Sequence, residues 1–249
     1  MKAANHSTLH KYDLVIFDWD GTLMDSIGKI IICIENMARA LALPVPSETD
    51  IRNVIGLSMT QALQMLFPCG LLSSPPRLSA SLELDIPVST SSIICTGTEA
   101  CYITMRAEFK TQYLHLDATP TPIFDQAPQL LESLTMAGYQ LAVATGKARA
   151  GLNRVWEQSG LGHYFIASRC ADEAPSKPHP EMILSLLQEL QIQPERALMV
   201  GDSLLDLTMA TNAGIDSIGV TYGAHSEAVL QQAKPIALID SPQQLFLHL

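Results

Sequence analysis

Short uninterrupted runs of apolar residues limit most strongly what this chain of 249 residues can fold into. The first run is Leu14–Phe17, and two similar runs occur at Leu141–Ala144 and Ala197–Val200. A strand that lacks alternating polar residues is buried on both faces, as in a parallel sheet that is covered by helices. The sequence therefore predicts an α/β fold with a parallel sheet.

Helical patterns separate the predicted strands beyond residue 123, which is the order expected when crossover helices join parallel strands. Gly138, Gly160 and Gly214 follow three of these patterns, and glycine in that place commonly ends a helix. The helices predicted here are Gln126–Ala137, Ala148–Ser159, Pro180–Leu190 and Leu204–Asn212, and a later strand is predicted at Ser217–Val220.

The sheet-forming pattern is divided along the chain. We predict one core domain made of residues 1–23 and 121–249, and an inserted cap domain, residues 24–120, that is mostly helical. Serine, threonine and proline crowd into residues 73–98, which predicts an irregular segment inside the cap. The proline-rich run Thr119–Pro122 predicts a hinge between the two domains. The cap helices are predicted to begin after Ser26 and at Ser47, Met59 and about residue 99.

Charge and hydropathy exclude several classes of function. The net charge of -10 would repel a phosphate backbone, so we expect no nucleic-acid partner. The first ten residues lack an apolar core and the most apolar stretch, residues 30–34, is flanked by charges, so we expect neither export nor a membrane span. Five cysteines without a Cys-x-x-Cys pair disfavour a disulfide framework and a zinc knuckle, which is typical of a cytoplasmic protein.

Polar residues follow three of the predicted strands. Asp18 and Asp20 follow the first strand, Thr145 follows the second and Asp202 follows the third. Because ligands of open parallel sheets bind beyond the carboxyl ends of the strands, we expect these side chains to gather at one edge of the sheet. Lys177 is predicted to join them from a loop.

These residue types point to phosphate chemistry. The carboxylates of Asp18, Asp20 and Asp202 form an all-oxygen ligand set that suits Mg²⁺. Asp18 is predicted to be both a metal ligand and the nucleophile, which would form an aspartyl phosphate. Asp20 is predicted to protonate the leaving alcohol and later to accept a proton from water. Lys177 is predicted to hold Asp18 ionised and to balance the charge of the phosphoryl group.

Four neighbouring residues are predicted to support this chemistry. Gly21 and Thr22 allow a sharp turn that would bring backbone N–H groups toward the phosphate oxygens. The Thr145 hydroxyl and the Gly146 amide would add two more donors. Asp206, one helical turn after the last of the three proposed metal ligands, is predicted to orient metal-bound water without binding the metal itself.

Each of these residues also has an ordinary structural explanation. Asp-x-Asp-Gly can be a simple turn, Thr145 and Asp202 can be helix N-caps, and Lys177 and Asp206 can be surface charges. Four signals of the right chemical type in order along the chain, three of them at strand ends, favour a phosphate site. Three further cations that could reach a substrate are interpreted as surface charges: Lys147, Arg149 and Arg169.

The run from Asp18 to Thr22 resembles the first motif, Asp-x-Asp-Gly-Thr, of the haloacid-dehalogenase-like hydrolase superfamily. Thr145, Lys177 and the run Gly201–Asp206 are similar to its other three motifs. The resemblance covers about residues 12–47 and 123 to the end. It implies a Rossmann-like core with an inserted helical cap, and the closest likeness is to phosphoglycolate phosphatases. It therefore implies a Mg²⁺-dependent phosphatase whose partner is a small phosphorylated metabolite.

Other functions on the same fold remain alternatives. A dehalogenase would need the carboxylate nucleophile but neither Asp20 nor a metal. A phosphohexose mutase would return the phosphoryl group to a sugar, usually with cations in the cap near residues 56–63, where this chain has none. A non-catalytic binding module should lack at least one of the core motif residues, and all are present. The sequence predicts neither a particular substrate nor an oligomeric state.

Overall fold

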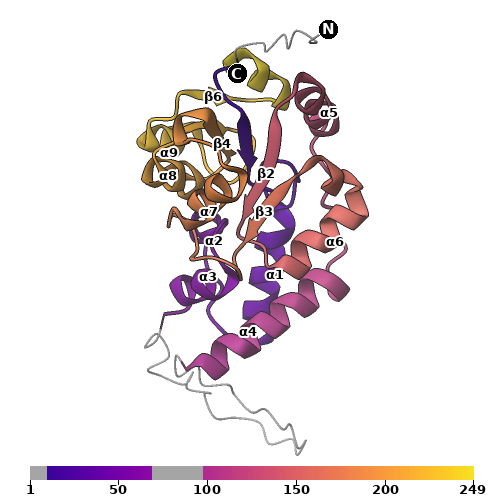
Figure 1. Cartoon of the computed structure of the whole chain (residues 1–249). Coiled ribbons are helices and arrows are strands. Elements are labelled where there is room, and N and C mark those ends of the chain that lie inside the picture. Colours follow the sequence, from indigo (N-terminus) through magenta and orange to yellow (C-terminus); the bar gives the residue numbers. More distant parts are fainter. Residues whose placement is uncertain (1–9, 69–97) are drawn as a thin grey trace, which may run out of the picture. The chain divides into compact units, whose positions relative to one another are not determined.

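A computed structural model describes residues 10–68 and 98–249 of the chain (Figure 1). In these residues one six-stranded sheet has the order β3-β2-β1-β4-β5-β6, and every neighbouring pair of strands is parallel. The predicted α/β fold with a Rossmann-like parallel sheet is therefore confirmed. Apart from Thr98, the segment predicted to be irregular lies outside the described residues. The strands are β1 Leu14–Phe17, β2 Gln140–Thr145, β3 Ala167–Cys170, β4 Ala197–Gly201, β5 Asp216–Val220 and β6 Ala237–Ile239.

The sheet belongs to the first of two compact units, which comprises the described residues up to Ile27, the short segment Ile55–Ser58 and the chain from Pro120 onward. Three of its helices end at a glycine with positive φ, as predicted: Gly138 at 97°, Gly160 at 71° and Gly214 at 73°. Its helices are α5 Ala127–Ala137, α6 Arg149–Ser159, α7 Glu181–Leu190, α8 Leu204–Ala213 and α9 Glu227–Leu230, with 3-10 turns at Leu161–Tyr164, Pro194–Arg196, Gln231–Ala233 and Pro242–His248.

Helices cover both faces of the sheet, which explains the uninterrupted apolar runs. Val15 and Phe17 of β1 pack into one apolar core with residues of α5 and α6. Leu14 and Ile16 of the same strand point the other way, into a second core with residues of α7 and α8. Since successive side chains of a strand alternate between faces, each residue of β1 must be apolar.

The sequence did not reveal the edge strands β3 and β6. The side chains of β3 are mostly half-buried, and the strand includes a serine and an arginine. The strand β6 has 3 residues, of which only Ile239 is buried. An edge strand pairs on one side only and needs no continuous apolar run, so neither segment carried the signal that identified the central strands.

The second compact unit comprises Gly28–Val54 and the described part of Met59–Thr119, and all of its regular structure there is helical. Its core includes Met37, Leu63 and Tyr102, and the Tyr102 hydroxyl donates to the Phe67 carbonyl at 3.1 Å. The helices of this second unit are α1 Ile27–Ala40, which begins in the first unit, α2 Glu48–Val54, α3 Met59–Leu66 and α4 Glu99–Thr111, which a π-helix, Gln112–Leu116, continues.

In the described residues no helix is long and apolar enough to cross a membrane.

Candidate active site

The pairing of β1 with β4 brings two of the predicted carboxylates together. Phe17 lies opposite Val200 in the sheet, and the Asp18 N–H donates to the Val200 carbonyl at 3.0 Å. Asp202 follows the end of β4 directly, so it lies beside Asp18 at the carboxyl edge of the sheet. Both residues are 1% exposed. The edge predicted for the site is therefore where these two side chains are found.

Lys177 joins this edge as a fully buried cation. Its Nζ lies 2.8 Å from Asp18 Oδ1 and 2.6 Å from Asp206 Oδ1. Burial opposes the charged ammonium, but the two carboxylates outweigh it and hold the pKa of Lys177 above its ordinary value. The lysine therefore stays charged and links the end of β1 to the first turn of α8.

The carboxylate of Asp202 is held by neighbouring backbone and by a hydroxyl. The Thr22 hydroxyl donates to Oδ1 at 2.9 Å, and the Ala224 N–H donates to Oδ2 at 2.7 Å. A Cβ atom at Gly21, whose φ is +76°, or at Gly223 would collide with this carboxylate. Glycine is therefore required at both positions by the close approach of Asp202.

Gly21 and Thr22 have structural contacts that the sequence did not predict. Their backbone N–H groups donate within the turn, to the Met24 carbonyl at 2.8 Å and to the Trp19 carbonyl at 3.4 Å. Donation of these groups to a phosphate would require the turn bonds to open. In this structure the two residues shape the turn and hold Asp202.

Asp206 has a more central place than the sequence suggested. Its carboxylate accepts from the Ser203 hydroxyl at 2.6 Å and from the Ser203 N–H at 3.1 Å, in a capping box at the start of α8. This cap turns the carboxylate back toward the strand ends, where it meets Lys177. Carboxylate oxygens of Asp18, Asp202 and Asp206 lie within 4.8 Å of one another. Asp20, predicted as a ligand, is not in this group.

The charges in this group fit a divalent cation. Three buried carboxylates face the single ammonium of Lys177, so the cluster carries a net charge of about -2 when all are ionised. Burial, Asp206 and Asp18 raise the pKa of Asp202 well above its usual range. Burial also raises the pKa of Asp18 to about 7, although Lys177 lowers it. A hard divalent ion such as Mg²⁺ would remove this excess charge, and carboxylate oxygen is its preferred protein ligand.

Asp20 lies outside this group of three carboxylates, and its own carboxylate contacts two side chains. Lys147 Nζ lies 2.9 Å from Asp20 Oδ1, and the Ser26 hydroxyl donates to the same oxygen. Only 11% of the Lys147 side chain and 12% of the Asp20 side chain are exposed. The interpretation of Lys147 as a surface charge is therefore wrong, because the turn after β2 directs it toward the neighbouring end of β1.

The turn after β2 carries the predicted phosphate donors. Thr145 is buried, and its Oγ1 accepts the Lys147 N–H at 3.2 Å, so the hydroxyl proton can be donated elsewhere. A Cβ atom at Gly146 would lie 2.6 Å and 2.7 Å from the carbonyl oxygens of Gly56 and Leu57. The 55–58 segment thus packs directly against this turn, a contact that sequence spacing does not reveal.

Two hydrogen bonds that connect neighbouring loops to the site were also not predicted from the sequence. The Ser58 N–H donates to Ser176 Oγ at 2.8 Å, next to Lys177. His225 Nδ1 accepts the Leu204 N–H at 2.9 Å, which ties the loop after β5 to the start of α8. Each hydrogen bond involves a single side chain, so no periodic pattern in the sequence indicates it.

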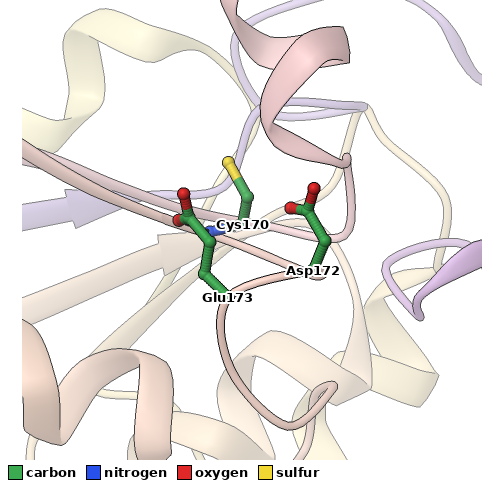
Figure 2. Close-up of side chains that lie close together, drawn as sticks. All are labelled: Cys170, Asp172 and Glu173. Carbon is green, nitrogen blue, oxygen red and sulfur yellow. Dashed lines mark hydrogen bonds between the residues drawn. The ribbon is translucent and has the colours of Figure 1, made fainter.

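A second group, Cys170, Asp172 and Glu173, has the spacing of a metal site but different chemistry (Figure 2). Glu173 accepts from Nε and Nη2 of Arg149, both at 2.7 Å, and Asp172 accepts the Arg149 N–H at 2.9 Å. Burial raises the pKa of the Cys170 thiol to about 12, so the thiol stays protonated. These contacts fasten the start of α6 and fit an ion pair better than a metal. Arg149, like Arg169 with Glu189, is thus a partly buried ion-pair partner rather than a free surface charge.

Comparison with known proteins connects this site to one family. The family described as "Haloacid dehalogenase-like hydrolase" matches residues 15–220. "Probable phosphatase IndB" of Dickeya dadantii is 34% identical over 229 residues, which cover 92% of this chain and 89% of that protein. A "Phosphoglycolate phosphatase" of Vibrio vulnificus is 29% identical over 243 residues and is covered to 96%. A solved structure of a predicted phosphoglycolate phosphatase from Haemophilus somnus shares the fold, with a TM-score of 0.76, 24% identity and coverage of 96% of this chain and 98% of that one.

Proposed function

The chain belongs to the family of haloacid dehalogenase-like hydrolases, and we propose that it is a Mg²⁺-dependent phosphatase. Its substrate would be a small phosphorylated metabolite, a phosphoglycolate-like phosphomonoester, and the reaction would pass through an aspartyl phosphate on Asp18. The observation that carries this proposal is the buried Asp18 carboxylate, which lies against Lys177 and beside two further carboxylates. The printed names of the relatives, which include phosphatases and phosphoglycolate phosphatases, support the same reaction class.

In the first step, a carboxylate oxygen of Asp18 attacks phosphorus. The bond between phosphorus and the ester oxygen breaks as the new bond forms, and protonated Asp20 gives its proton to the departing oxygen. An alcohol is released, and Asp20 is left as a carboxylate. The ammonium of Lys177, 2.8 Å from Asp18 Oδ1, keeps negative charge favourable at the nucleophile while the phosphoryl group arrives.

In the second step, water attacks the phosphorus of the aspartyl phosphate. Asp20 takes a proton from this water, and the Asp18 oxygen departs with the bonding electron pair. Inorganic phosphate is released, and both aspartates return to their starting states. Division of hydrolysis into two displacements lets one carboxylate serve first as acid and then as base.

The remaining residues bind and orient the phosphate. The Thr145 hydroxyl and the Gly146 N–H would donate to its oxygens. Asp18 and Asp202 would hold Mg²⁺, with Asp206 beside them in the same carboxylate group. The bound ion would neutralise the charge between the carboxylates and the phosphoryl oxygens.

The test is a panel of phosphorylated metabolites assayed for phosphate release with and without Mg²⁺. Wild-type protein should release phosphate from at least one ester only with the metal present, and Asp18→Asn should abolish release. Asp125→Asn, at an exposed position, is the matched control and should retain activity. Acid-quenched protein should carry a phosphoryl group on Asp18 that hydroxylamine removes. Turnover by Asp18→Asn would refute the assignment of the nucleophile.

A further inference from the structure

The Asp20 carboxylate is held by two side chains to which the two displacements assign no role. Lys147 Nζ lies 2.9 Å from Oδ1, and the Ser26 hydroxyl donates to the same oxygen. Ser26 is 0% exposed, and the Lys147 and Asp20 side chains are nearly buried. Both contacts thus fix one oxygen of the carboxylate in a largely dry environment.

The position of Lys147 is itself fixed by the turn that carries the phosphate donors. Its N–H donates to Thr145 Oγ1 at 3.2 Å, and its carbonyl accepts the Ala171 N–H at 2.9 Å. A long lysine side chain loses rotamer freedom and hydration when it is buried, so a defined contact must compensate. The pair with Asp20 is such a contact, and it couples the acid and base to the phosphate-binding turn.

We propose that Lys147 is a positioning residue for proton transfer by Asp20, an inference that rests on the proposed phosphatase function. Together with Ser26 it holds Oδ1, so that Oδ2 is the oxygen that exchanges the proton. In the first displacement the Oδ2–H bond breaks, the proton joins the departing ester oxygen, and the electron pair stays on the carboxylate. The resulting negative charge lies beside the Lys147 ammonium and the Ser26 hydroxyl, which were in place before the step began.

This role predicts a dependence on the leaving group. Nitrophenolate departs readily without a proton, whereas an alkoxide requires one, so misplacement of Asp20 should affect alkyl esters far more. General acid catalysis by a positioned side chain commonly contributes about 100-fold to 10,000-fold. We expect Lys147→Met, which leaves Asp20 in place but loosened, to lower kcat/KM for an alkyl phosphate by about 10-fold to 100-fold. For p-nitrophenyl phosphate, whose leaving group needs no proton, the loss should stay within about threefold.

The experiment measures kcat/KM for a series of aryl and alkyl phosphates whose ester groups bear no charged substituent, so that recognition of a second anionic group plays no part. In Lys147→Met the rate should fall more steeply along the series, from nitrophenyl to alkyl ester, than in wild type. Lys147→Arg keeps the positive charge and should recover most of the alkyl-ester rate. Ser26→Ala should steepen the dependence as well. Lys11→Met removes an exposed lysine–aspartate pair at the same 2.9 Å distance and should leave the series unchanged.

Equal losses on every ester would show that Lys147 binds phosphate or maintains the fold, and would overturn the positioning role. An unchanged series in Lys147→Met would overturn it too. Circular dichroism melts establish that each variant is folded; if Lys147→Met is not, an unchanged slope in Ser26→Ala overturns the proposal. Absence of turnover by wild type both on this series and on the panel of phosphorylated metabolites would instead refute the phosphatase function itself.

Discussion

Replacement of Lys177 by methionine should destabilise the protein strongly, because it removes the positive charge. Methionine has a similar length, so the packing of the side chain changes little. The ammonium of Lys177 is the partner of both Asp18 and Asp206, at 2.8 Å and 2.6 Å, and the three side chains are at most 2% exposed. Removal of one partner from a buried ion pair costs about 3–5 kcal/mol, since the remaining charge is left without compensation. For a chain of this size that loss corresponds to a melting temperature lower by about 6–20 °C.

The assay is urea unfolding of metal-free protein at a pH of about 8, where the carboxylates are most ionised, followed by fluorescence of the buried Trp19. Lys11→Met removes an exposed ion pair with Asp216 and should cost no more than about 1 kcal/mol. Adding Asp206→Asn to Lys177→Met should recover part of the loss, because one uncompensated carboxylate disappears. A loss below about 1 kcal/mol in Lys177→Met would show that Lys177 and its two carboxylates do not depend on one another as a buried ion pair does.

Three further predictions concern packing, pH and thiol reactivity. Gly146→Ala should destabilise the protein by about 1–3 kcal/mol and lower its activity, because the new Cβ would collide with carbonyl oxygens of the 55–58 segment. Gly28→Ala places its Cβ where no atom lies within 4 Å and should not destabilise the protein, and thermal melts of both variants test this. The folded pKa of Asp18 is raised from 3.8 to about 7, so its contribution to stability is present at low pH and is lost as the pH rises through about 7. Metal-free protein should therefore unfold at lower urea at a pH of about 8 than at about 5, and Mg²⁺ should stabilise it more at the higher pH; equal stabilisation at both would contradict this. Because burial raises the pKa of Cys170 to about 12, iodoacetamide at a pH of about 8 should label this thiol only after unfolding, as peptide mass spectrometry would show.

The central strands could be predicted from the sequence because a strand buried on both faces is an uninterrupted run of apolar residues. Each residue of Leu14–Phe17 faces one of two apolar cores, so the strand cannot contain a polar residue. The edge strand Ala167–Cys170 has no such requirement and was missed. Glycines at helix ends were equally readable, since Gly138 and Gly160 adopt the left-handed backbone that other residues avoid.

The residues of the candidate site could also be predicted from the sequence, but the ion pairs between them could not. Asp18, Lys177 and Asp202 have the residue types and strand-end positions that phosphate chemistry needs, and the structure brings them to one edge. Their catalytic roles stay predictions until the substrate panel is measured. The sequence placed Asp206 outside the ligand set and Lys147 on the surface, whereas both form ion pairs within the site.

Local patterns in the chain were enough to predict the parallel sheet, the order of the strand-end residues and the reaction class that they suggest. The pairing of cations with carboxylates became known from the folded protein: Lys177 pairs with Asp18 and Asp206, and Lys147 pairs with Asp20. Apolar periodicity and glycine positions are local properties, so they can be recognised along the chain without knowledge of its fold. Ion pairing depends on distances of a few ångströms between segments far apart in sequence, and these are set by strand register, helix capping and burial acting together.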